Sequence, residues 1–115
     1  MKWLSMTLAA CVLMCAGTGR SATTQGEVTL NLNPTKELPR NSEGAFVTLQ
    51  SGRILFYYTQ FYGGARDESP ARIVSIHSDD GGRTWSAEPR VVVENEGGDN
   101  VMSVSLLRLA SGRIA

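Results

Sequence analysis

Carboxyl, guanidinium and amide side chains gather in three short segments of this chain, residues 36–43, 63–70 and 94–101. Seven of the eleven acidic residues lie there: Glu37, Glu43, Asp67, Glu68, Glu94, Glu96 and Asp99. The same segments carry Arg40, Asn41, Arg66 and Asn100. Carboxyl groups can donate protons to a glycosidic oxygen, and sugars need many hydrogen-bond donors and acceptors. The pattern fits a carbohydrate site, and it equally fits ordinary surface loops, which are polar in most proteins.

Four runs rich in β-branched and aromatic residues lie around these segments. They predict strands at about residues 44–49, 54–62, 71–77 and 90–93. Ser51-Gly52 is a tight-turn signal between the first two runs. The fold class is therefore expected to be all-β, with antiparallel strands joined in sequence order.

Strands that run up and down place their connections alternately at two ends of a sheet. The turn at Ser51-Gly52 and the turn after the third strand should share one end, and the three polar segments should share the other. His77, the only histidine, belongs to the first end, where a structural role is expected. Tyr62 lies at the edge of a polar segment and is the aromatic residue best placed to stack on a sugar.

The turn between the third and fourth strands is an octet, residues 78–85, with the sequence Ser-Asp-Asp-Gly-Gly-Arg-Thr-Trp. Ser and Asp side chains accept hydrogen bonds from nearby backbone N–H groups, and glycine adopts turn conformations that other residues resist. The octet lacks the alternating ligands of an EF-hand and the Gly-Lys-Ser/Thr of a phosphate loop. Its fixed positions are Ser78, Asp80, Gly82, Thr84 and Trp85, to which we assign a structural role.

A hairpin signal repeats along the chain. Leu-Gln-Ser-Gly-Arg-Ile at residues 49–54 returns as Leu-Ala-Ser-Gly-Arg-Ile at residues 109–114, so Gly52 is matched by Gly112, 60 positions later. A fixed period of this kind indicates a repeat architecture, and four antiparallel strands per repeat are typical of a propeller blade.

The octet is identified as an Asp box, and the stretch 39–115 resembles the sialidase (neuraminidase) superfamily, in particular its secreted bacterial sialidase-like members. The resemblance implies a six-bladed β-propeller. The chain would cover about one and a third blades, with the first blade at about residues 40–95 and the start of the second at about 102–115. We expect an N-terminal fragment that is inactive alone, because the family's tyrosine nucleophile and its glutamate partner come from later blades.

The resemblance also implies roles for particular residues. Arg40 would anchor the substrate and Asp67 would be the catalytic acid/base, with Glu43 and Asn100 as further substrate-binding candidates. Guanidinium suits the anchoring role because it grips a carboxylate through two hydrogen bonds.

Two other alignments remain open. Matching Ala45-Phe46 to the family's strand places Ser42 at the arginine position, and counting back from the Asp box places Pro70 near the aspartate. Gln60 and Phe61 occupy the region in which the family carries a second arginine.

The function implied is an exo-glycosidase that removes terminal sugars, including sialic acid, from glycans. The alternatives are a non-catalytic propeller that binds glycans or proteins, and a glycan lyase on the same scaffold. No cofactor and no metal site is expected. Eleven basic and eleven acidic residues balance, so the charge indicates neither nucleic acid nor an anionic membrane as partner.

Residues 1–22 have the pattern of a signal peptide, with a basic start, an apolar run and small residues near Gly17 and Gly19. The apolar run is too short to span a bilayer. Export to the periplasm or the medium is expected, with lipidation at Cys11 or a buried N-terminal helix as alternatives. Both cysteines lie in this segment, so the mature chain would have no disulfide. Residues 23–38 form a lead-in to the first blade.

Overall fold

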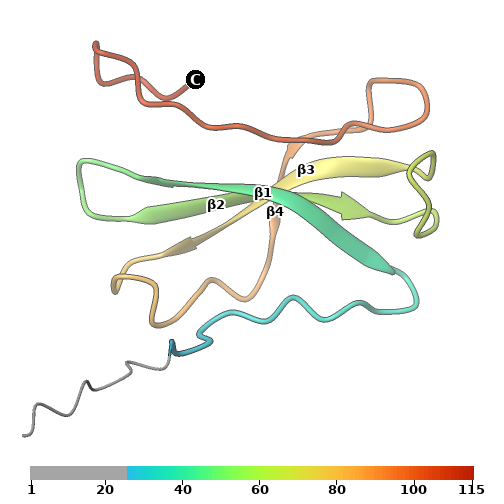
Figure 1. The fold of residues 1–115 in the computed structure, drawn as a ribbon, viewed down its shortest axis with the longest axis horizontal. Coiled ribbons are helices and arrows are strands. Elements are labelled where there is room, and N and C mark those ends of the chain that lie inside the picture. The colour runs from blue at the N-terminus through green and yellow to red at the C-terminus, as the bar shows by residue number, and fades with distance from the viewer. Residues whose placement is uncertain (1–25) are drawn as a thin grey trace, which may run out of the picture.

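Runs of β-branched and aromatic residues form the four strands of the computed structural model, which describes residues 26–115 (Figure 1). The strands are β1 (Arg40–Thr48), β2 (Ile54–Phe61), β3 (Ala71–Ser78) and β4 (Arg90–Val93). All pairings are antiparallel, and the strand order follows the chain, β1-β2-β3-β4. The predicted all-β class is confirmed for these residues, which contain no helix.

Strand β1 begins four residues before the predicted start because it contains a β-bulge. Ser42 pairs with Thr59 and Gly44 pairs with Tyr58, so Glu43 is an extra residue without a partner on β2. Glu43 has a φ of 30°, which is uncommon for a residue with a side chain. The polar sequence Asn-Ser-Glu-Gly resembles a turn, and the bulge is what allows it to belong to a strand.

One face of the sheet carries a core of Tyr58, Val74 and Ile76, which are at most 3% exposed. Phe56 and Val91 from the sheet pack against this core, as does Trp85 from the octet. Leu30 and Leu32 from the lead-in complete it. The lead-in therefore lies against this face of the sheet (Figure 1).

The opposite face is approached by the C-terminal segment. Val101 donates its backbone N–H to the carbonyl of Ala71 at 3.1 Å, and Ser103 donates its N–H to the Thr59 hydroxyl at 3.2 Å. Phe61 and Thr59 are fully buried on this side. Different segments of the chain thus cover the two faces.

The sequence repeat is also a structural repeat. In the first turn, Gly52 donates to the Leu49 carbonyl at 3.0 Å and has a φ of 87°. In the second turn, Gly112 donates to the Leu109 carbonyl at 2.9 Å and has a φ of 83°. Glycine adopts this left-handed conformation without the steric cost that a Cβ brings.

The pairing beside each turn is equivalent as well. Thr48 pairs with Ile54 beside the first turn, and Arg108 forms a bridge with Ile114 beside the second, at the same spacing. Leu107 and Ala115 also exchange backbone hydrogen bonds of 2.7 and 2.8 Å, although residues 102–115 contain no extended strand. Arg108 also donates to the Thr48 carbonyl, which joins the two hairpins.

A second backbone feature repeats at the same interval, and no sequence pattern predicted it. Glu43 and Ser103, 60 positions apart, are the two residues other than glycine with positive φ in the described part of the chain, at 30° and 67°. Both repeats therefore depart from regular strand geometry at an equivalent position.

Connections alternate between two ends of the sheet, as the strand order predicts. The turns at residues 49–53 and 78–85 lie at the left in Figure 1, and the loops 63–70 and 94–101 lie at the right with the start of β1. The predicted signal peptide and lipidation site lie outside the described residues. Within residues 26–115, no helix is long and apolar enough to span a membrane.

Candidate functional site

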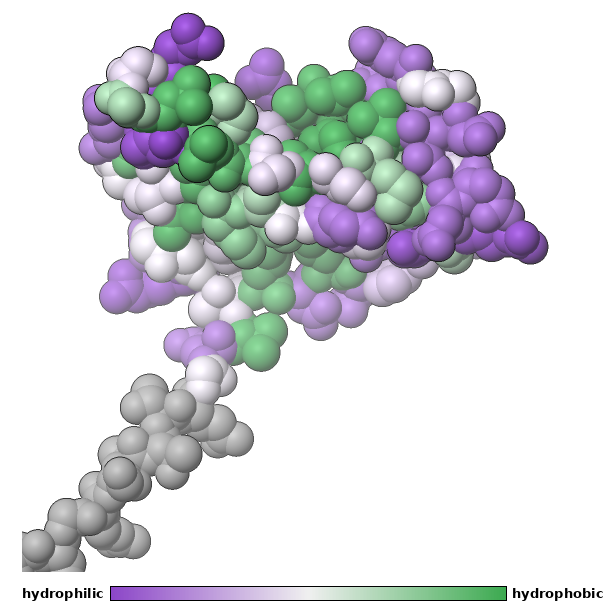
Figure 2. Space-filling model, turned by 45° about the horizontal axis from the view of Figure 1, so that its top comes forward, coloured by the Kyte–Doolittle hydropathy of each residue, from purple (hydrophilic) through white to green (hydrophobic). Residues whose placement is uncertain are grey.

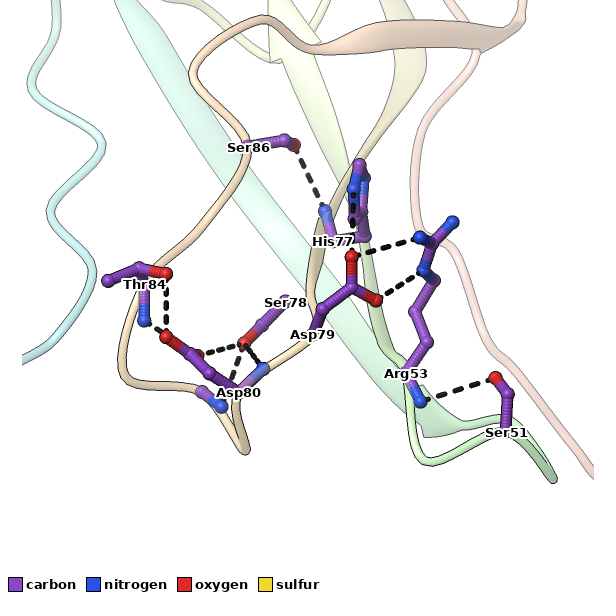
Figure 3. A network of polar contacts seen from close by, with 9 residues as sticks. Ser51, Arg53, His77, Ser78, Asp79, Asp80, Thr84 and Ser86 are labelled. Carbon is purple, nitrogen blue, oxygen red and sulfur yellow. Dashed lines mark hydrogen bonds and ion pairs between the residues drawn. The ribbon is translucent and has the colours of Figure 1, made fainter.

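The octet is closed by hydrogen bonds from its fixed side chains (Figure 3). Ser78 Oγ accepts the Gly82 N–H at 2.8 Å and donates to Asp80 Oδ1 at 2.8 Å. Asp80 Oδ1 accepts the N–H groups of Arg83 and Thr84 at 2.9 Å each, and Oδ2 accepts the Thr84 hydroxyl at 2.7 Å. These bonds, above all the one from the Thr84 side chain, hold the pKa of Asp80 far below its ordinary value.

The octet is also attached to the sheet through Trp85. Gly81 and Gly82 have φ values of 74° and 88°, which turn the chain back toward the strands. The indole then packs on the core, with its ring centroid 6.4 Å from Phe56 and 5.9 Å from Phe46 in edge-on contacts. Every fixed position of the octet therefore contributes to the turn or to its packing.

An ion pair links the octet to the β1–β2 turn (Figure 3). Arg53 Nε lies 2.6 Å from Asp79 Oδ1, and Nη2 lies 2.9 Å from Oδ2. The hydrogen bond from Arg53 lowers the pKa of Asp79. His77 lies at this same end, with Nε2 3.8 Å from Asp79 Oδ2.

At the other end, the structure brings Arg40 and Asp67 together. Arg40 Nη1 lies 2.6 Å from Asp67 Oδ1 and 3.2 Å from the Ala65 carbonyl. The guanidinium carbon sits 4.5 Å from the Phe61 ring centroid, a cation–π arrangement. The Arg40 side chain is 29% exposed and that of Asp67 is 82% exposed. The arginine is thus held against the sheet, whereas the carboxylate projects into solvent.

Asn100 joins the same cluster through the backbone of the loop that carries Asp67. Its Nδ2 donates to the Asp67 carbonyl at 2.5 Å and to the Ser69 carbonyl at 3.3 Å. Ser69 Oγ in turn accepts the Arg66 N–H at 3.1 Å within the loop. The Asn100 amide nitrogen therefore positions the loop 63–70, which is a different role from contacting a substrate.

Glu43 and the residues of the alternative alignments lie in other surroundings. Glu43 Oε2 accepts the Ser42 hydroxyl at 2.5 Å, at the bulge of β1. Ser42 pairs across the sheet with Thr59. Pro70 closes the loop by accepting the Tyr62 N–H at 3.1 Å, and its side chain has no group that could transfer a proton. Among these positions, Asp67 is the one that places a carboxyl group beside a guanidinium.

Arg72 is a further guanidinium at this end, besides Arg40 and Arg66, and it was not among the residues predicted from the sequence. Its Nε and Nη2 donate to Gln60 Oε1 at 3.1 and 2.9 Å, and it lies 5.4 Å from the Tyr62 ring centroid. Asn41, Gln60 and Arg72 are register partners, so they share the sheet face opposite to Arg40. In the sequence, Arg72 could have been recognised as the charged residue between the apolar Ala71 and Ile73 of a predicted strand.

The hydroxyl of Tyr58 is a buried polar group close to Gln60 and Arg72. Burial raises the pKa of the Tyr58 hydroxyl, and the charge of Arg72 and a hydrogen bond with Gln60 oppose that rise. Figure 2 shows polar residues gathered at the right-hand end of the molecule, where these loops lie, and hydrophobic residues along the face crossed by the C-terminal segment.

The cluster contains a carboxylate, a guanidinium and several backbone carbonyls, which suits binding of a polar ligand and proton transfer. Residues 26–115 contain no group of three or more His, Cys, Asp or Glu side chains placed to hold a metal ion. No protein-family model matches this chain, and no curated protein matches it significantly.

Proposed function

We propose that the four-stranded sheet is one blade of a six-bladed sialidase-like propeller, and that the protein is an exported glycosidase that removes terminal sugars, including sialic acid. One observation carries this proposal. Arg40, Asp67 and Asn100 come from three separate segments and meet at the end opposite the octet.

Three features support the blade. The sheet is an antiparallel meander of four strands, which is the composition of a propeller blade. The octet joins β3 to β4, with the hydrogen bonds expected of an Asp box. The β1–β2 hairpin returns 60 residues later with the same turn and the same pairing.

In this proposal Asp67 donates a proton to the departing oxygen and Arg40 binds the acidic group of the substrate. The Arg40–Asp67 ion pair is exposed on the carboxylate side, and exposed pairs are weak. A substrate carboxylate can therefore exchange with Asp67 on the guanidinium, which stays on the Phe61 ring. In the family that this chain resembles, a Tyr/Glu pair from other blades forms a covalent glycosyl intermediate.

The pairing of Arg40 with Asp67 also favours the second candidate, a propeller that binds glycans or proteins without catalysis. The guanidinium and the carboxylate already bind each other in this structure, as they would if the ion pair served only to hold the loop 63–70 in place. A glycan lyase on the same scaffold would use the same end of the sheet.

The test is an activity assay on the purified full-length protein. A fluorogenic sialoside and a panel of other fluorogenic glycosides are assayed with wild type, Arg40→Ala and Asp67→Ala. We expect sialoside turnover that both substitutions abolish. Turnover of another glycoside alone would retain the hydrolase and discard sialic acid as substrate. A folded protein that binds glycans without turnover would be the non-catalytic propeller.

A further inference from the structure

Arg40, the first residue of β1, has an equivalent one repeat later. Asn100 lies 60 positions after Arg40, which is the interval of the sequence repeat. Arg40 precedes Glu43 by three positions, and Asn100 precedes Ser103 by three. Glu43 and Ser103 are the two residues other than glycine with positive φ within residues 26–115. Arg40 and Asn100 therefore occupy the same position in two successive repeats.

Both side chains reach the same loop, the one between β2 and β3. Arg40 Nη1 donates to the Ala65 carbonyl at 3.2 Å and to Asp67 Oδ1 at 2.6 Å. Asn100 Nδ2 donates to the Asp67 carbonyl at 2.5 Å and to the Ser69 carbonyl at 3.3 Å. The loop that carries Asp67 is thus held by one side chain from each repeat.

The two side chains hold different parts of the loop. Arg40 binds the Asp67 carboxylate, and that contact is given up when the acidic group of a substrate takes the guanidinium. Asn100 binds backbone carbonyls, so its two hydrogen bonds persist after the exchange. The Asp67 side chain is 82% exposed, and its reach into the site therefore depends on where the loop backbone is held.

Asn100 is itself fixed by the residues that follow it. Val101 donates its N–H to the Ala71 carbonyl at 3.1 Å, and Ser103 donates its N–H to the Thr59 hydroxyl at 3.2 Å. Ala71 and Thr59 are fully buried, so these acceptors belong to the rigid part of the sheet. The segment that leads into the second repeat is therefore bound to β2 and β3, and it presents Asn100 to the loop end.

We propose that Asn100 is a positioning residue that holds Asp67 where its carboxyl group can protonate the departing oxygen. The proton donor of the first repeat would then be placed by the second repeat. This inference rests on the proposed glycosidase function and adds a residue to it. Misplacement of a catalytic group by about 1 Å can cost about a hundredfold in rate. Blades of a propeller pack through the broad faces of their sheets, whereas the Asn100 contacts lie at the loop end, where the proposed architecture leaves them in place.

The test is steady-state kinetics of the full-length wild type and Asn100→Ala on two glycosides of sialic acid, or of the sugar that the fluorogenic panel selects. One substrate has a 4-methylumbelliferyl leaving group and the other has lactose. An aryl leaving group departs with little protonation, whereas a sugar oxygen needs a proton donor. We expect Asn100→Ala to lower kcat about tenfold on the lactose glycoside and less than about threefold on the aryl glycoside. KM should stay unchanged, because Arg40 still binds the substrate.

Two further variants separate this role from a general effect on folding. Asn95 Nδ2 donates to the Asp99 carbonyl at 3.0 Å, which is the same kind of bond within the linker 94–101. Asn95→Ala should therefore retain the wild-type kcat and KM on both substrates. Asn100→Asp keeps the size of the side chain and removes the N–H donors, so it should behave as Asn100→Ala does.

Equal losses on the two substrates would overturn the inference, because a merely structural defect does not depend on the leaving group. Unchanged kinetics of Asn100→Ala in an active protein would overturn it too, and so would a raised KM with unchanged kcat, which would make Asn100 a substrate-binding residue. In each of these cases the proposed function stands. A wild type that turns over neither substrate would instead overturn the proposed function, together with the catalytic role of Asn100.

Discussion

Replacement of Ser78 by alanine tests whether the octet holds the end of the blade as described. The Ser78 side chain is 1% exposed, and its hydroxyl makes two hydrogen bonds of 2.8 Å, one from the Gly82 N–H and one to Asp80 Oδ1. Each bond of this kind contributes about 1 kcal/mol, and the Gly82 N–H left without its partner adds to the cost. We expect Ser78→Ala to lower the free energy of unfolding by about 2 kcal/mol.

Urea unfolding of the full-length protein followed by circular dichroism measures this change. With a denaturant slope of about 2 kcal/mol per molar, the midpoint should fall by about 1 M. Ser51→Ala is the matched control, because Ser51 Oγ accepts one exposed bond of 3.4 Å from the Arg53 N–H. That control should change stability by less than about 0.5 kcal/mol. Equal effects of the two substitutions would show that the Ser78 hydroxyl does not stabilise the octet.

Three further predictions concern the octet, the sheet and the loop. The folded-state pKa of Asp80 lies below its unfolded value of about 3.9. The ionised Asp80 carboxylate therefore stabilises the folded protein above about pH 4, and this stabilisation is lost as pH falls. Asp80→Asn should flatten the pH dependence of the urea unfolding midpoint below about pH 4. Gly44→Ala places a Cβ 2.3 Å from the stacked Phe56 ring and should cost about 1–3 kcal/mol in the same urea titration, whereas Gly26→Ala meets nothing within 4 Å and should be neutral. Asn100→Ala removes the two hydrogen bonds from Asn100 Nδ2 to the loop 63–70 and should speed amide hydrogen exchange in that loop, measured by mass spectrometry. Unchanged exchange would show that Asn100 does not hold the loop in place.

Strand positions were predictable because local composition decides them. The predicted strands at 54–62, 71–77 and 90–93 agree with β2, β3 and β4 to within one residue at each end. The placement of turns at two ends followed from antiparallel order alone. The start of β1 was not predictable, since a bulge at Glu43 keeps a turn-like sequence within the strand.

The composition of the site was predicted better than its contacts. The order of the predicted strands put Arg40, Asp67 and Asn100 at one end of the sheet. The Arg40–Asp67 ion pair and the hydrogen bond from Asn100 to the Asp67 carbonyl, however, join residues 27 and 33 positions apart. Such contacts depend on tertiary packing, which no local pattern specifies. The same holds for Leu30 and Leu32 of the lead-in, whose packing on the core has no local signal.

We propose that the loop end of the sheet carries the chemistry and that the octet end stabilises the fold. Each end carries an aspartate paired with an arginine at 2.6 Å, Asp67 with Arg40 and Asp79 with Arg53. Glycoside turnover by full-length Asp67→Asn and Asp79→Asn proteins therefore compares the same change at the two ends. We expect Asp67→Asn to abolish turnover and Asp79→Asn to retain it. Equal turnover by the two variants would show that Asp67 has no catalytic role that Asp79 lacks.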